Sequence, residues 1–302
     1  MTLFSALGRL LVFPGLLYAV PAAWFMEWMH RSLTAKMQGR IGPPFFQPFF
    51  DFVKLLAKTP VRRTGFQGLA MTALPLIAVS AMLGTIALLP VLPAGGGFTG
   101  DLILLVSLIE VAPLCLVLAG FASRSLFGGI GATREAVLTV AYNLPFLTAL
   151  LALSAATGSF SLAGLVSAPV WLVRVPALIA LLLTLPVKLH LNPFSAASAE
   201  QEIYTGATTE YEGPRLALWE LAHALEWVAL CGLWAVLAFP IIALAWPLRV
   251  LIFVATSLVL VVALTTASAA TARLKVAQIS RFFWLWGLGV AVIALAAALV
   301  RL

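Results

Sequence analysis

The amino-acid sequence predicts an all-α, polytopic membrane protein, from its composition and from the length of its apolar runs. Of the 302 residues, 63% are hydrophobic and 10% are charged, and the mean hydropathy is +1.09. Such a chain has too little polar surface to face water on all sides. The apolar runs are about 20 residues long, which is the length that a helix needs to cross a bilayer. Because the backbone inside lipid must satisfy its own hydrogen bonds, these runs are expected to be helices.

Eight apolar runs of this length follow one another along the chain. They cover residues 5–29, 67–90, 102–122, 136–156, 171–190, 216–237, 247–271 and 282–300. The first run continues into EWMHRSL without a cleavage site, so it is expected to be a retained helix and not a secretory signal. No internal repeat of about 20–50 residues is evident, so residues 1–302 are expected to form one transmembrane domain.

The distribution of basic residues predicts the orientation in the membrane. Most of the 18 Lys and Arg residues lie in the linkers after the first, third, fifth and seventh runs. By the positive-inside rule these linkers are cytoplasmic, and an even number of spans then places both termini outside. The rule also explains the net charge of +7, so no nucleic-acid partner is expected.

The stretch RIGPPFFQPFFDFVKLLAK, directly after the first run, predicts an amphipathic interfacial segment over residues 44–59. Asp51, Lys54 and Lys58 recur at helical spacing, phenylalanines cover the other sides, and Pro48 suits the first helical position. Such a helix lies in the plane of the membrane surface. Two interpretations remain: a plain lipid anchor, or the mouth of a site between the membrane and a soluble partner.

Ionisable groups inside apolar runs are costly and are usually retained for function. Glu110 lies near the middle of the third run, and Glu220, His223 and Glu226 follow one another at three-residue steps in the sixth. These steps keep the three side chains near one side of a helix. They form either a ladder that passes protons or a set of structural pairs with basic residues of other helices. Lys188, at the end of the fifth run, is explained by snorkelling toward the interface.

The linker over residues 191–215 is acidic, although it belongs to the basic side of the protein. It contains Glu200, Glu202, Glu210 and Glu212. Acidic residues count little in the topology rule, so a solvated loop would explain them. Carboxylates leading to the ladder would also form an entrance that collects protons.

Other motifs indicate no cofactor on this chain. Cys115 and Cys231 lie in separate apolar runs without a C-x-x-C pattern, so they read as small hydrophobic residues and cannot hold an iron–sulfur cluster. The glycines of residues 94–100 and 128–132 follow no strand, so they read as loop glycines.

Three segments resemble one known family of membrane subunits. RIGPPFFQPFFDFVKLLAK resembles the signature that this family shows both in the proton-pumping NADH:quinone oxidoreductases and in formate hydrogenlyase subunit 4. LAGFASRSLFGGIGATREA and AEQEIYTGATTEYEGPRLALWELAHAL resemble, in the same order, the family's segment between spans 3 and 4 and its acidic linker with the following helix. The wording EYEGPRLALWELAHAL is most similar to the energy-converting [NiFe]-hydrogenase branch (group 4).

The resemblance implies a non-catalytic, energy-coupling subunit in a bacterial or archaeal cytoplasmic membrane, with no redox catalysis of its own. Its expected partners are hydrogenase-like large and small subunits and ferredoxin-like subunits with iron–sulfur clusters, a nickel–iron centre in the hydrogenase branch, and antiporter-like membrane subunits in the lipid bilayer. The expected docking residues are Arg40, Asp51, Lys54, Lys58, Glu212 and Arg215. The expected proton-path residues are Glu110, Glu135, Glu200, Glu202, Glu210, Glu220, His223 and Glu226.

One departure from the family pattern concerns the fourth run, where Asn143 stands in place of a glutamate. Either Glu110 or Glu135 substitutes for that acid, or ion transfer is impaired or routed differently. Two alternatives to the hydrogenase-type subunit remain: a subunit that forms a lipid-quinone site near residues 40–58, and a free-standing transporter. No pair of broken, inverted helices supports the transporter.

Overall fold

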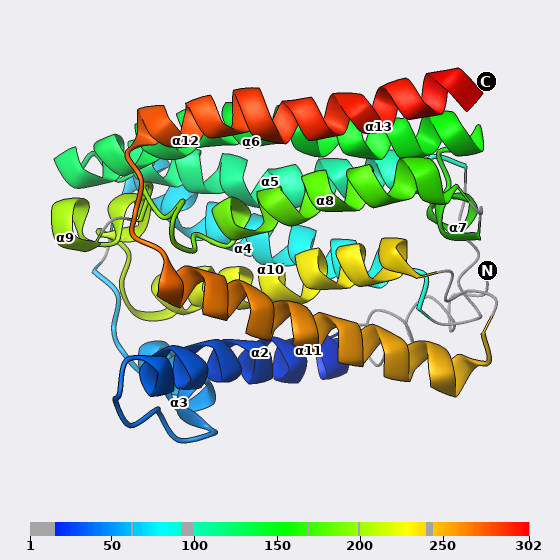
Figure 1. Ribbon diagram of the computed structural model, residues 1–302. Helices are drawn as coiled ribbons and strands as arrows, with labels where there is room; N and C mark the ends of the chain where they lie inside the picture. The colour runs from blue at the N-terminus through cyan, green and yellow to red at the C-terminus, as the bar shows by residue number, and fades with distance from the viewer. Residues whose placement is uncertain are drawn as a thin grey trace.

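The chain is described by a computed structural model, which covers residues 16–61, 63–91, 99–167, 170–198, 200–239 and 244–301. Within these ranges the regular structure is helical, as predicted. The helices are α2 (Leu16–Met37), α3 (Gln47–Leu56), α4 (Gly65–Leu88), α5 (Asp101–Ala122), α6 (Leu126–Thr157), α7 (Leu162–Ser167), α8 (Trp171–Lys188), α9 (Glu200–Ile203), α10 (Gly213–Ala238), α11 (Trp246–Ala270), α12 (Val276–Phe282) and α13 (Leu288–Arg301). The long helices lie side by side in one bundle (Figure 1).

Seven segments of the described chain are long and apolar enough to cross a membrane. They are helices α4, α5, α6, α8, α10 and α11 and the continuous helical segment Val276–Val300, in which a π-helical turn joins α12 to α13. These segments confirm the second to eighth predicted spans. The first predicted span, 5–29, begins in residues outside the described part, and its described portion is the start of α2.

Helix α10 is the central helix of the bundle. In its most apolar window 83% of the residues are buried, compared with 28% in Val276–Val300. It packs against α2, α4, α8 and α11 and lies between these helices in Figure 1. The predicted ladder is therefore carried by the helix that is most enclosed by protein.

The amphipathic segment folds as the short helix α3, beside α2. Trp24 of α2 contacts the rings of Phe49 and Phe52, with centroids 5.3 and 5.6 Å apart. Phe46 and Phe50 remain exposed on the other side of α3. Pro48 is the second helical residue and not the first, because the helix begins at Gln47.

Helix α6 corrects two expectations. It begins at Leu126 and not near residue 136, so Arg134 lies in a helix and not in a linker, and the glycines of 128–132 are helical and not in a loop. Glycine is needed at position 131 because the backbone of another segment lies very close. A Cβ atom on Gly131 would lie 2.6 Å from the backbone nitrogen of Ala207. The linker before α10 is therefore pressed directly onto α6.

The polar linkers gather at one end of the bundle, which we call the linker end. Helices α3 and α9 lie at this end, whereas α7 lies at the opposite end (Figure 1). Hydrogen bonds tie the linkers together: the Val61 amide donates to Glu212 at 2.9 Å, and Arg63 pairs with Glu210 at 3.1 Å. The segments predicted to be cytoplasmic therefore form one connected surface.

Candidate functional site

A cavity of about 370 Å³ lies inside the bundle near the linker end, and we call it the central cavity. Glu220, His223 and Glu226 of α10 all line it. Their three-residue spacing keeps them on one side of the helix, as the sequence predicts. His223 Nδ1 lies 3.2 Å from a carboxylate oxygen of Glu226. The three residues of the ladder therefore border one shared cavity.

Helix α2 contributes three ionisable residues to the central cavity: Glu27, His30 and Arg31. Arg31 pairs with Glu27 in its own helix and with Asp51 of α3, the latter at 3.2 Å. His30 Nδ1 lies 3.0 Å from Thr265 Oγ1 of α11. These α2 residues are not among those predicted. They could have been predicted from the sequence, because EWMHR places ionisable residues at the end of an apolar run.

Glu135 of α6 and His190, which follows α8, form the opposite wall. The Glu135 side chain is 3% exposed, and a carboxylate oxygen lies 3.2 Å from His190 Nε2. The His190 ring stacks on His223, with the centroids 5.6 Å apart. Burial alone lowers the pKa of His190, but the charge of Glu135 and its hydrogen bond outweigh burial and raise this pKa to about 9. The contact with Glu135 therefore favours the protonated form of His190.

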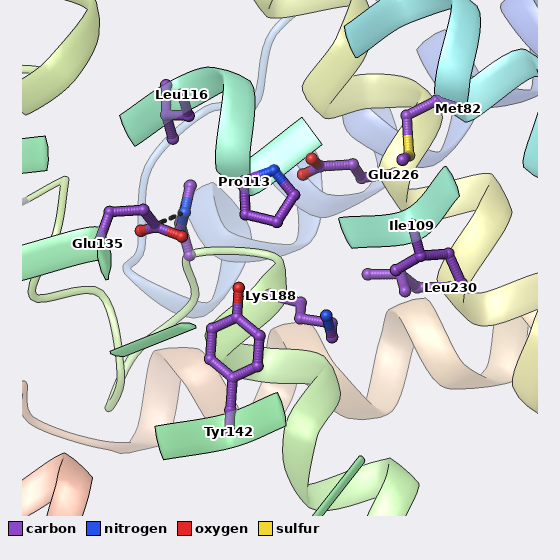
Figure 2. Close-up of a pocket in the computed structure, with 10 residues that line it drawn as sticks. Met82, Ile109, Pro113, Leu116, Glu135, Tyr142, Lys188, Glu226 and Leu230 are labelled. Atoms are coloured by element: carbon purple, nitrogen blue, oxygen red, sulfur yellow. Dashed lines mark hydrogen bonds and ion pairs between the residues drawn. The ribbon is translucent and has the colours of Figure 1, made fainter. Parts of the chain in front are cut away.

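A smaller space, which we call the inner cavity, continues from the central cavity and has a volume of about 20 Å³. The two share Glu135, His190 and Glu226, and the inner cavity adds Tyr142 and Lys188. Figure 2 shows the carboxylates of Glu135 and Glu226 on either side of Pro113, with Tyr142 and Lys188 nearby. The inner cavity thus joins the ladder to the end of α8.

Lys188 is buried in a polar triad with two other residues. Its Nζ atom lies 2.7 Å from Glu110 and 3.3 Å from Asn143 Oδ1, and Asn143 Nδ2 donates to Glu110 at 2.5 Å. The ammonium also lies over the rings of Tyr142 and Phe146, at 4.5 and 4.6 Å. The expectation that Lys188 snorkels to the interface is wrong, because the partly buried carboxylate of Glu110 holds the ammonium inside the bundle.

A third space, the side cavity, lies between α2, α3 and α10 and has a volume of about 280 Å³. It shares Glu27, Arg31 and Glu220 with the central cavity. Three of the expected docking residues, Asp51, Lys54 and Lys58, line it as well. The charged side of α3 therefore borders the same cavity as Glu220, the first residue of the ladder.

Other predicted residues lie outside these cavities. Glu202 pairs with Arg134 and Arg273, both at 2.6 Å, and its hydrogen bond from Arg134 lowers its pKa.

The remaining docking and path candidates lie on or near the linker-end surface. Arg215 donates to Thr72 Oγ1 and to the carbonyl of Val61, at 3.1 and 3.3 Å. Arg40 is exposed in the turn before α3, and the side chain of Glu200 lies outside the described part of the chain. Glu210 pairs with Arg63, and Glu212 accepts a hydrogen bond from the Val61 amide. The structure therefore joins Glu110, Glu135, Glu220, His223 and Glu226 but not the linker glutamates.

Together, the helices and cavities define a class: a multi-pass membrane protein with a chain of ionisable groups inside its bundle. The sequence matches the NADH dehydrogenase family over residues 10–299. The chain belongs to this family.

Many known proteins are similar to this chain, and two of them bear on its role. Hydrogenase-4 component C of Escherichia coli (strain K12) is 33% identical over 219 residues, which cover 70% of this chain and 69% of that protein. Among solved structures, the membrane-bound sulfane sulfur reductase, an archaeal respiratory membrane complex, contains a chain with the same fold. Its TM-score is 0.86 at 24% identity, with 98% of this chain and 100% of that chain covered.

Proposed function

We propose that this chain is a membrane subunit of a complex I-like, membrane-bound [NiFe] hydrogenase or formate hydrogenlyase-type complex. It anchors a peripheral redox arm at the linker end and couples electron transfer in that arm to ion translocation. The family membership and the similarity to a hydrogenase-4 component support this proposal. The partner subunits, and not this chain, carry the iron–sulfur clusters and the nickel–iron centre. The linker end faces the cytoplasm, and both termini face outside.

The single observation that carries the coupling role is the series of three connected cavities. The side, central and inner cavities share ionisable residues at each junction: Glu27, Arg31 and Glu220 at the first, and Glu135, His190 and Glu226 at the second. Carboxylates and imidazoles can bind and release protons in turn. A change of charge at the linker end would therefore be transmitted along these side chains to Lys188, which contacts Glu110.

The docking role is supported by the connected linker surface. Lys54 of α3 and Lys58, just beyond the end of α3, are exposed, and Glu212 binds the amide of Val61, which stiffens the neighbouring segment. A rigid surface with fixed charges favours a specific encounter with a soluble partner. The phenylalanines of α3 set the depth of this surface in the interface.

The alternative reading as a lipid-quinone site is less well supported by the side cavity. Besides the apolar Trp24, Pro48, Phe52, Leu55 and Leu221, that cavity is lined by six ionisable residues: Glu27, Arg31, Asp51, Lys54, Lys58 and Glu220. Pockets for apolar ligands are lined mainly by hydrophobic residues with a few polar groups, so an isoprenoid tail fits this lining poorly. Reduction of a quinone analogue by the purified complex would favour the alternative, and hydrogen evolution without quinone would oppose it.

The test uses Glu220→Gln and Glu226→Gln in the assembled complex, reconstituted in vesicles, with the ion gradient and the redox turnover measured separately. We expect each variant to lower ion translocation at least about tenfold, because an amide cannot accept a proton. Glu202→Gln is the matched control, since it makes the same change outside the cavities. Full-rate pumping by both cavity variants would show that the ladder is structural.

A further inference from the structure

The buried triad of Lys188, Glu110 and Asn143 bears on which ion moves through this subunit. Lys188 lies at the inner end of the connected cavities and is held by hydrogen bonds and two aromatic rings. Its side chain is 4% exposed. An ammonium in such a place carries a desolvation cost that a structural role could have avoided with an apolar residue. The triad therefore calls for a functional explanation.

The size of the inner cavity limits what can reach Lys188. A volume of about 20 Å³ is room for about one water molecule. A sodium ion would need several oxygen ligands or part of its hydration shell, and the space beside Glu110 is already filled by the ammonium. A second positive charge next to Lys188 would also be strongly repelled in a medium of low dielectric constant. A proton needs neither the space nor the ligands.

We propose that Lys188 makes the inner end of this path selective for protons over sodium ions, and that it relays the proton between Glu226 and Glu110. This inference rests on the proposed coupling function. First, the ammonium gives one proton to the Glu110 carboxylate, which leaves a neutral amine and a carboxylic acid. The amine then takes a proton, through one water in the inner cavity, from the acid form of Glu226. One proton has moved from Glu226 to Glu110, and Lys188 is an ammonium again.

Asn143 has a positioning role in this scheme. Its Nδ2 group donates to one oxygen of Glu110, and its Oδ1 atom accepts a hydrogen bond from Lys188. It thus holds both partners at hydrogen-bonding distance without competing for the proton, as a carboxylate would. The substitution that departs from the family pattern is then compatible with ion transfer through this subunit.

The deciding variant is Lys188→Arg in the complete complex, reconstituted in vesicles. Arginine keeps the positive charge and the pairing with Glu110, but it does not release its proton in proteins. We expect proton translocation to fall at least tenfold while redox turnover and subunit assembly stay within twofold of the wild type. The exposed Lys36→Arg is the matched control and should pump normally. Wild-type pumping by Lys188→Arg would overturn the relay.

A second measurement uses the wild-type complex and does not depend on how the variant folds. The gradient is measured in sodium-free buffer and with added sodium, using a protonophore and a sodium ionophore in turn. A proton gradient that forms without sodium and collapses with the protonophore supports the proposal. A gradient that requires sodium overturns the selectivity but leaves the coupling function standing. The absence of any gradient during turnover would instead contradict the proposed function itself.

Discussion

Two groups of ion pairs in this chain have the same chemistry in different surroundings. Lys188 meets Glu110 inside the bundle, where the lysine side chain is 4% exposed. Glu202 meets Arg134 and Arg273 at the linker end, where the glutamate side chain is 47% exposed. Losing one partner inside leaves an uncompensated buried charge, whereas water replaces the partner outside. Burial, and not the number of charges, should therefore decide which pair the fold depends on.

The largest effect is expected from Lys188→Met, which leaves the partly buried Glu110 carboxylate without a cation and with only the Asn143 hydrogen bond. We expect a loss of about 3–5 kcal/mol of stability, measured by thermal unfolding in detergent. The double variant Lys188→Met with Glu110→Gln removes both charges and should recover much of the loss. If the single variant unfolds at the wild-type temperature, the buried pair does not stabilise the fold and the comparison fails.

An intermediate effect is expected from the pair of His190 and Glu135. The pKa of His190 in the folded chain is raised to about 9, above its ordinary value, so the pair stabilises the protein fully below about pH 6.5. This contribution is lost as the pH rises from there through 9. It should amount to about 1.5–3 kcal/mol, as for a charge-assisted hydrogen bond.

The His190 prediction is checked by unfolding scans from pH 6 to pH 10. The wild type should lose stability over this range, and His190→Gln should lose less, since glutamine does not titrate. The readout is the difference between the two chains at each pH, because other groups titrate in the same interval. Parallel curves for the two chains would count against the charged pair.

The smallest effect is expected from Glu202→Gln at the linker end. Because the side chain is solvated, the change should leave the unfolding midpoint and ion translocation almost unaltered, and added salt should hide what difference remains. A large loss of stability at low salt would show that the Glu202 cluster works as a network. It would also end the simple contrast between the two groups of ion pairs.

Much of the fold could be predicted, because membrane helices leave a strong signal in hydropathy. The runs that became α4, α5, α8, α10 and α11 have nearly the predicted bounds. The start of α6 could not be predicted, since glycines in a sequence suggest a loop. The contact of Gly131 with Ala207 depends on a segment that is distant in the chain.

The candidate site could be predicted only where an acid stands alone among apolar residues. Glu110 and the ladder of α10 were found in this way. The burial of Lys188 could not be predicted, because its position at a helix end suggests snorkelling and its partner Glu110 lies on another helix. Glu27 was overlooked because its place in the central cavity depends on how α2 packs against α10.

The close contact between Gly131 and Ala207 has a mechanical consequence. Glu135 is one helical turn beyond Gly131 on α6, and Gly131, Ala207 and Glu135 all border the central cavity. Because no side chain separates the linker backbone from α6 at Gly131, a displacement of the linker would displace this part of α6 as well. A displacement of the linker before α10 would then be transmitted to the buried carboxylate of Glu135, which is one helical turn away.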